Sequence, residues 1–160
     1  MKKHLMCSTL LSLCLLFASC GTPKYRNDIP CSDIVNALTS EILSADSYAR
    51  YSDDELTFLL EDRSLYNDCC YVYTRSSDDI SEIAIFKSSQ DVEALKAKIE
   101  EYAALQKKEK RSFLENYLPS ERKKLDECEV RRFGEYVVFV VLDEVDKAIV
   151  FDKVEVLLEA

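Results

Sequence analysis

Apolar side chains recur at spacings of three and four in the first half of the chain, a pattern that predicts helices. Residues 30–43, PCSDIVNALTSEIL, show this spacing behind Pro30, a residue that the first turn of a helix tolerates. Residues 51–62, YSDDELTFLLED, add Ser52 and Glu55 at the separation of a capping box. We therefore expect two helices before the first strand.

Four shorter runs are rich in β-branched and aromatic residues, which predicts strands. Residues 69–75 and 82–87 flank a polar loop and should form an antiparallel hairpin. Residues 128–133 and 136–142 flank the pair Gly-Glu at 134–135, which suits a type II′ hairpin turn because the glycine comes first. Both alternating sets of the last run are apolar, so that strand should be covered on both faces.

A long helix is expected between the two hairpins, and another at the C-terminus. The helical spacing returns after Ser88 and Asp91, the expected cap pair, and it ends near Pro119. The charge run KKEKR at 107–111 interrupts the apolar stripe and is interpreted as a solvated face. The C-terminal segment should start a helix behind Asp143, with a strand over its β-branched part as the alternative.

The order of these elements indicates the fold class α+β. We expect a four-stranded, mostly antiparallel sheet, made of two hairpins joined by a long helix, with helices packed against it. The strand order does not follow from the sequence. The length suits one hydrophobic core, so residues 30–160 are predicted to form a single α+β domain.

The N-terminus has the layout of a bacterial secretory signal. A positively charged start at residues 1–4 precedes an apolar run at 5–18, which is shorter than the roughly 20 residues of a membrane span. Phe-Ala-Ser directly before Cys20 resembles a lipobox, in which the cysteine takes a diacylglycerol and becomes the new N-terminus. We predict a lipoprotein signal peptide at 1–19, lipid attachment at Cys20 and a tether at 20–29. Plain secretion and an uncleaved anchor are the alternatives.

The charge of the processed chain limits its partners. Cleavage before Cys20 removes two lysines and no acid, so the formal net charge changes from −9 to −11. Such a field opposes sequence-independent binding of nucleic acid and adsorption to an anionic bilayer. We therefore expect no nucleic acid partner. The expected location is the cell membrane, facing outside the cytoplasm, with contact through the N-terminal diacylglycerol-cysteine.

The composition excludes several kinds of catalytic site. His4 is the only histidine and leaves with the signal peptide, which removes histidine bases and histidine-bearing zinc sites. Gly21 and Gly134 cannot form a glycine-rich phosphate loop. We expect no catalytic residues, no cofactor and no metal site. Hydrolysis by paired carboxylates is an alternative, although helix caps and loops account better for Asp53, Asp54, Asp78 and Asp79.

Two further residue types are candidates for a role. Four cysteines outside the cell can form two disulfides by three connectivities, or they can be small buried hydrophobes; they are Cys31, Cys69, Cys70 and Cys128. Adjacent residues on a strand point to opposite faces, so the neighbouring pair is poorly placed to bond to itself. Tyrosines near the first hairpin suit an interface, or they pack helices onto the sheet; they are Tyr48, Tyr51, Tyr66, Tyr71 and Tyr73.

Three stretches resemble a family of short bacterial lipoproteins that carry a domain of unknown function, number 4358. They are Glu82–Lys87, Tyr117–Pro119 and Gly134–Val137, with Glu135 where asparagine is common in the family. The resemblance covers roughly Ala45 to the C-terminus. It implies one fold and surface anchoring, and it supplies no catalytic residues.

These observations predict a lipid-anchored, surface-exposed envelope lipoprotein whose domain is a non-catalytic binding or interaction module. The expected partner is an unknown envelope protein or polymer. A small-solute-binding receptor and a carboxylate-based hydrolase are the alternatives.

Overall fold

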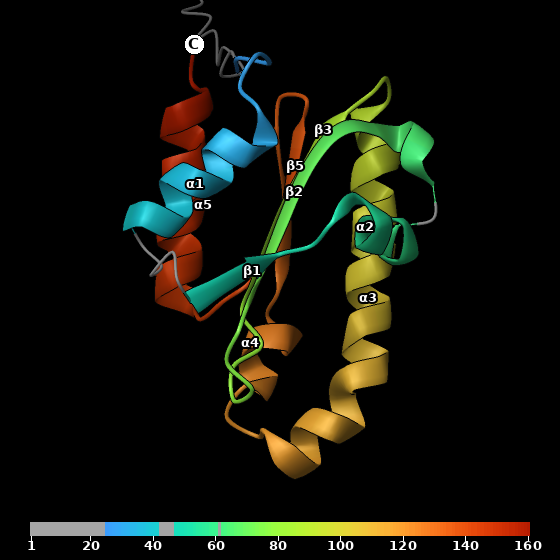
Figure 1. Ribbon diagram of the computed structural model, residues 1–160, viewed down its shortest axis with the longest axis vertical. Helices are drawn as coiled ribbons and strands as arrows, with labels where there is room; N and C mark the ends of the chain where they lie inside the picture. Colours follow the sequence, from blue (N-terminus) through green and yellow to red (C-terminus); the bar gives the residue numbers. More distant parts are fainter. Residues whose placement is uncertain (1–24, 42–46, 61) are drawn as a thin grey trace, which may run out of the picture.

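The computed structural model describes residues 25–41, 47–60 and 62–160. The expected signal peptide and the lipid-attachment residue Cys20 lie outside these described residues. Figure 1 shows the described part as a sheet seen nearly edge-on, with helices on both sides.

Five strands form one sheet in the order β1-β2-β3-β5-β4, and every neighbouring pair is antiparallel. Both expected hairpins are confirmed, but the prediction of four strands is wrong. The additional strand lies at the edge beside β2 and has only three residues, too few to show an alternating pattern. The strands are β1 (Tyr48–Arg50), β2 (Tyr66–Thr74), β3 (Glu82–Ser88), β4 (Glu129–Phe133) and β5 (Tyr136–Val141).

The helices cover both faces of the sheet. Helices α1 and α5 lie on one face, and α3 lies on the other (Figure 1). The described helices are α1 (Cys31–Glu41), α2 (Asp53–Leu59), α3 (Val92–Tyr117), α4 (Arg122–Asp126) and α5 (Glu144–Leu158), and a 3₁₀ turn spans Arg63–Leu65. The C-terminal segment is thus helical, and the strand alternative is wrong. The short helix α4 was not predicted.

Helix caps explain where the predicted helices begin. The capping box of Ser52 and Glu55 is present at α2. Asp91 caps α3 and accepts hydrogen bonds from two backbone N–H groups, and Asp143 does the same for α5. The expected role of Ser88 at the α3 cap is wrong, because this residue ends β3 and its N–H donates to the carbonyl of Glu135 (2.9 Å).

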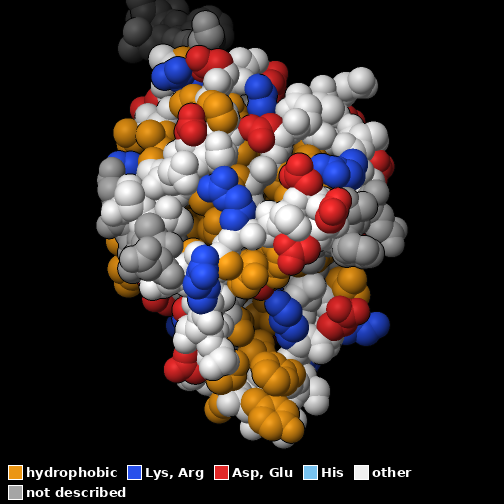
Figure 2. All heavy atoms as spheres, in the orientation of Figure 1, with side chains coloured by type: hydrophobic (Ala, Val, Ile, Leu, Met, Phe, Trp, Pro, Cys, Tyr) orange, Lys and Arg blue, Asp and Glu red, His pale blue; other side chains and the backbone are white. Residues whose placement is uncertain are grey.

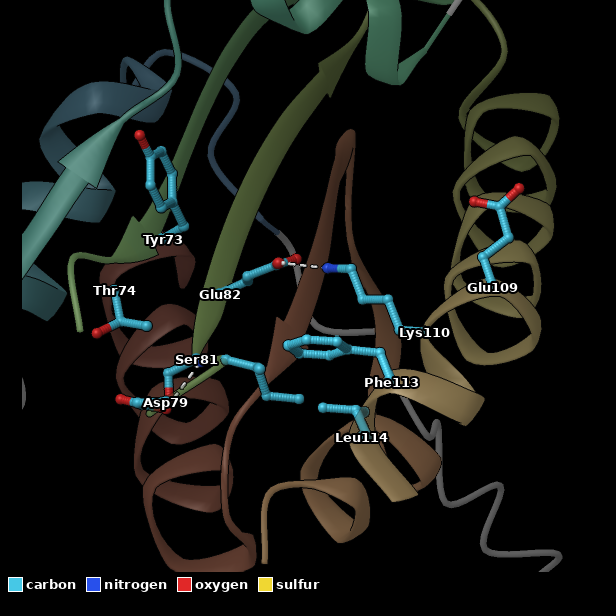
Figure 3. Close-up of a pocket in the computed structure, with 10 residues that line it drawn as sticks. Tyr73, Thr74, Asp79, Ser81, Glu82, Glu109, Lys110, Phe113 and Leu114 are labelled. Carbon is cyan, nitrogen blue, oxygen red and sulfur yellow. Dashed lines mark hydrogen bonds and ion pairs between the residues drawn. The ribbon is translucent and has the colours of Figure 1, made fainter. Parts of the chain in front are cut away.

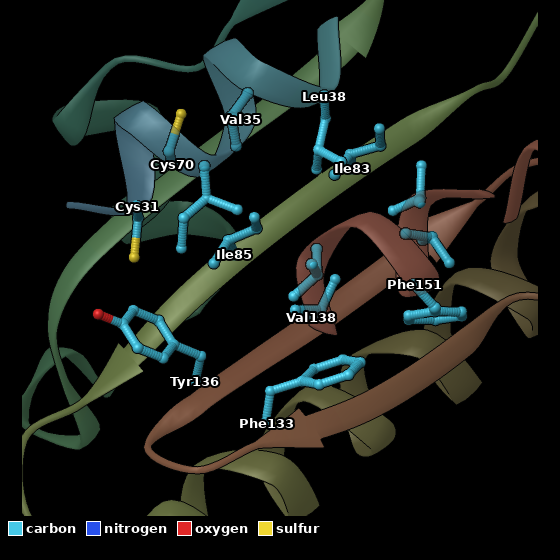
Figure 4. Close-up of a cluster of buried hydrophobic side chains, with 14 of the residues drawn as sticks. Cys31, Val35, Leu38, Cys70, Ile83, Ile85, Phe133, Tyr136, Val138 and Phe151 are labelled. Atoms are coloured by element: carbon cyan, nitrogen blue, oxygen red, sulfur yellow. The ribbon is translucent and has the colours of Figure 1, made fainter. Parts of the chain in front are cut away.

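Two hydrophobic cores lie on the two faces of the sheet. One joins α1 and α5 to the sheet, and Figure 4 shows part of it. The other joins α2, α3 and α4 to the opposite face. Every residue of β5 is buried, as its two apolar faces predicted. Burial of a large aliphatic or aromatic side chain contributes about 1.5–3 kcal/mol, so the buried central strands β3 and β5 contribute strongly to stability.

The turn between β4 and β5 is of the expected type II′. Gly134 has a φ of 60°, and no other described residue has a positive φ, as this turn requires. An added Cβ at Gly134 would lie 2.8 Å from the Cβ of Tyr25, so the glycine also makes room for the start of the described chain.

The start of the described chain packs on the domain. Tyr25 pairs with Glu159 in an isolated β-bridge, and the N–H of Arg26 donates to the carbonyl of Leu158 at 2.7 Å. The N–H of Ile29 donates to the hydroxyl of Tyr136, which donates back to the Ile29 carbonyl. The expected tether at 20–29 is therefore wrong for residues 25–29, which belong to the folded domain.

Candidate functional site

A cavity of about 320 Å³ opens between α3 and the end of the β2–β3 hairpin. Residues of four segments line it: the end of β2, the loop into β3, the first residue of β3, and the second half of α3. We call it the α3 groove, and it is lined by Tyr73, Thr74, Asp79, Ile80, Ser81, Glu82, Glu109, Lys110, Phe113 and Leu114. Figure 3 shows Lys110, Phe113 and Leu114 reaching from α3 toward Glu82 and Ser81 on the sheet side.

Glu82 stands at the floor of the groove with both carboxylate oxygens occupied. Its side chain is only 10% exposed, and the Lys110 ammonium donates to Oε1 at 3.1 Å. The buried Tyr71 hydroxyl donates to Oε2 at 2.6 Å and lies 3.3 Å from the Tyr102 hydroxyl. Burial, and then the Glu82 carboxylate, raise the pKa of Tyr71 well above its usual value, so this hydroxyl keeps the proton that it donates.

Aromatic rings support this network from the β1 side. The ring of Tyr51 contacts Tyr71 edge-on at 5.0 Å between centroids and lies 4.4 Å from the ring of Tyr73. Phe139, from the sheet centre, contacts the rings of Tyr71 and Tyr102. These contacts hold the ring of Tyr71 in the orientation that directs its hydroxyl to Glu82.

A second ion-pair network closes the loop end of the groove. The Lys124 ammonium lies 2.9 Å from Asp79 and 2.7 Å from Glu121. Burial acts to raise the pKa of Asp79, but hydrogen bonds from Ser81 and Lys124 outweigh it and lower that pKa to about 2. Asp79 is therefore held as a carboxylate, and α4 is fixed to the β2–β3 loop.

Exposed aromatic side chains extend the groove along α3. Phe113 is 52% exposed and Tyr117 is 72% exposed, with ring centroids 5.3 Å apart. Figure 2 shows hydrophobic side chains gathered at the end of the molecule where α3 ends. An exposed aromatic pair beside a cavity is typical of a contact surface.

The sequence interpretation of the charge run 107–111 is wrong for two of its residues. Lys107 donates to the carbonyl of Asp126 at 2.8 Å, and Lys110 reaches Glu82. The two residues are three apart and therefore share one helix face, which points toward the domain. Lys108 and Arg111 have the same spacing, so the charge run alone held no signal that located the groove. Asp79, assigned to a loop, is also a groove residue.

The candidate cysteines do not gather into one site. Cys31 and Cys70 belong to the core on the α1 side, whereas Cys69 and Cys128 pack against the core on the α3 side. All four are free thiols in the structure. Burial raises the pKa of each of them, that of Cys70 to about 11, so they are protonated and weakly reactive.

The sheet also separates Cys128 from the other three. It precedes β4, three strand positions from β2, which is roughly 14 Å at about 4.8 Å per strand. Disulfide-bonded Cα atoms lie within about 7 Å of each other. Cys31 is near β2, because its N–H donates to Asp68. Among these four cysteines, a disulfide in this fold is therefore limited to Cys31 with Cys69 or Cys70.

The candidate tyrosines mainly pack helices and strands. Tyr66 and Tyr71 are buried in the core on the α3 side, and Tyr48 and Tyr51 pack against the two cores. Tyr73 is the one of the five that lines the groove.

Within residues 25–41, 47–60 and 62–160, no group of histidine, cysteine or acidic side chains has an arrangement that could hold a metal ion. None of the helices in the described part of the chain has the length and apolar character to cross a membrane.

Comparison with known proteins found one family. Searches of curated proteins and of solved structures gave no match. The sequence model of a family described as "Domain of unknown function (DUF4358)" matches residues 53–142, which run from α2 through β5 and include the whole α3 groove. As the match spans more than half of the chain, the protein belongs to the DUF4358 family.

Proposed function

We propose that the protein is a lipid-anchored lipoprotein of the bacterial cell envelope whose domain is a non-catalytic binding module. The α3 groove is the proposed binding site. The observation that carries this proposal is the combination of an open cavity, an exposed aromatic rim, and charged groups held in fixed positions by Tyr71, Lys110 and Lys124. Ligand sites are typically concave and apolar with a few oriented polar groups.

The same geometry favours binding over hydrolysis. A hydrolase based on two carboxylates needs a general acid whose pKa is raised, so that it carries a proton near neutral pH. Asp79 has a lowered pKa and is bound to Lys124, and Glu82 accepts from both Tyr71 and Lys110. The contacts of Asp79 keep it ionised, which suits recognition and opposes proton donation.

The shape of the site favours a segment of a larger partner over an enclosed small solute. A volume of about 320 Å³ is at the lower end of the range for ligand pockets. The groove continues past Phe113 to the exposed ring of Tyr117, which does not line the cavity and which a confined solute would leave uncovered. A partner that crosses α3 would bury both.

Crosslinking in intact cells tests the binding role. A photoreactive benzoylphenylalanine placed at Phe113 should capture one specific envelope protein or polymer. The matched control is the same residue at Leu105, which lies on the same helix, is 47% exposed and does not line the groove. Capture at Phe113 and not at Leu105 supports the proposal. Recovery of uncrosslinked protein alone from both variants would contradict it.

The anchor has a separate test. Cys20→Ala should abolish labelling with radioactive palmitate and processing by signal peptidase II, because the thiol that receives the diacylglycerol is lost. The matched control is Cys7→Ala, which changes a cysteine inside the expected signal peptide. Labelled lipid on the Cys20→Ala protein would refute the anchor while leaving the binding role open to the crosslinking test.

A further inference from the structure

The α3 groove has an excess of negative charge. Three carboxylates line it, Asp79, Glu82 and Glu109, against one ammonium group, that of Lys110. Lys124 pairs with Asp79 from outside the lining, but it pairs equally with Glu121, so this network adds no net positive charge.

Glu109 accounts for part of this excess. It is exposed at the rim and has no ion-pair partner among the described residues, whereas Glu82 is paired with Lys110. An incoming group would therefore meet uncompensated negative charge at the mouth of the groove. This potential attracts cations and repels anions.

The groove already accommodates an amine. The Lys110 ammonium enters from α3, passes beside Phe113 and donates to Glu82 (Figure 3). The Lys110 side chain is 37% exposed, so it is able to leave this position without disturbing a buried core. Its position shows which chemistry fits: a long apolar stem that ends in a cationic donor.

The rim adds an apolar requirement. The half-exposed ring of Phe113 lies between the acidic groove and Tyr117, and the face of an aromatic ring also attracts cations. A ligand that covers this rim must carry apolar groups next to its charge. Free amines and metal ions lack such groups, whereas a peptide segment has them on neighbouring side chains.

We infer that the α3 groove binds a basic segment of a protein partner. A lysine or arginine side chain of the partner enters the groove toward Glu82 and Glu109, displacing or joining Lys110, and flanking apolar side chains cover Phe113 and Tyr117. This inference rests on the proposed binding role and adds the charge and the chemical class of the ligand.

The test uses three matched peptides and the full processed protein, purified from membranes in detergent. The peptides read Gly-Leu-X-Leu-Gly, with photoreactive leucine at both leucines and with lysine, norleucine or glutamate at X. Each is titrated to millimolar concentration and crosslinked by light, and mass spectrometry locates the crosslinks. We expect saturable crosslinks of the lysine peptide to residues 79–82 and 109–117, weaker crosslinks of the norleucine peptide, and none of the glutamate peptide.

Two variants test the charge with opposite signs. Glu109→Gln removes an exposed charge and should weaken binding of the lysine peptide about threefold, as expected for one charge at close range in a largely aqueous site. Lys110→Met removes the competing amine and should strengthen binding by a similar factor. Glu109→Gln changes only an exposed side chain, so it remains informative if Lys110→Met fails to fold.

The inference would be overturned by any of three results: preference for the glutamate peptide, loss of binding of the lysine peptide in Lys110→Met, or equal crosslinking of all three peptides. Absence of saturable crosslinks with the lysine peptide would overturn it as well. If Phe113 still captures a partner in cells in any of these cases, the binding role stands and only the charge assignment fails. If that capture also fails, both are wrong.

Discussion

Replacing Tyr71 with phenylalanine removes one oxygen atom from the centre of the candidate site and keeps the buried ring. Tyr71 is 1% exposed, and its ring contacts with Tyr51 and Phe139 do not involve the hydroxyl. The change therefore creates little empty space. Its main effect is on Glu82, whose Oε2 loses the 2.6 Å hydrogen bond, and on Tyr102, whose hydroxyl loses a neighbour at 3.3 Å.

The expected loss of stability follows from the burial of Glu82. A hydrogen bond to a charged group contributes about 1.5–3 kcal/mol, and the full value applies when the remaining charge stays buried. The Glu82 side chain is 10% exposed and keeps only its contact with Lys110. We expect Tyr71→Phe to lower the free energy of unfolding by about 2 kcal/mol, which corresponds to a decrease in Tm of roughly 8 °C for a domain of this size.

Urea denaturation followed by circular dichroism measures this loss. Tyr73→Phe is the matched control: it makes the same chemical change two residues along the same strand, and it should alter stability by less than about 0.5 kcal/mol. A double-mutant cycle with Glu82→Gln should give a coupling energy of about 1–2 kcal/mol. Equal effects of the two tyrosine variants, or a coupling energy near zero, would refute the assigned role of the Tyr71–Glu82 hydrogen bond.

Three further predictions follow from other parts of the fold. Gly134→Ala should lower the free energy of unfolding by about 2 kcal/mol, because alanine is strained at a φ of 60° and its Cβ meets Tyr25. The control Glu135→Ala changes an exposed position of the same turn and should have little effect, so equal urea midpoints of the two variants would contradict the prediction. The pKa of Asp79 in the folded state is below its ordinary value of 3.8, so the stabilising contribution of this carboxylate is present above pH 3.8 and is lost as the pH falls toward about 2. Asp79→Asn should remove this part of the acid sensitivity when the free energy of unfolding is measured as a function of pH. Alkylation of the unfolded, unreduced domain should label four thiols, and a count of two would reveal a disulfide.

Local chemistry explains which elements were predictable. Helix caps and turn residues act within a few positions of the chain, so the sequence alone contains the information needed to predict them. These residues are Ser52 and Glu55 in the capping box, the caps Asp91 and Asp143, and the turn residue Gly134. The two apolar sets of β5 also predicted a strand covered on both faces, because a strand with one face in solvent would have polar residues at alternate positions.

The elements that were missed depend on contacts between distant segments. Strand β1 has three residues and is a strand only because Tyr48–Arg50 pairs with Thr74–Val72. Helix α4 has no side-chain cap and is held by Lys124, which reaches Asp79 across 45 positions of sequence. The groove was missed for the same reason: Glu82 and Lys110 are 28 residues apart, and a charge run gives no sign of which residues turn inward.

The packing of Tyr25 and Arg26 beside the end of α5 has a consequence for how the protein would stand on a bilayer. Only four residues separate Cys20 from Tyr25, so a lipid at Cys20 would hold the domain within about 18 Å of the membrane surface. The start of the described chain and the C-terminus lie at one end of the molecule, and the loop from β2 to β3 and the end of α3 lie at the other (Figure 1). Helix α3, about 39 Å long, would then act as a spacer that presents the α3 groove on the membrane-distal side, within reach of partners that do not touch lipid.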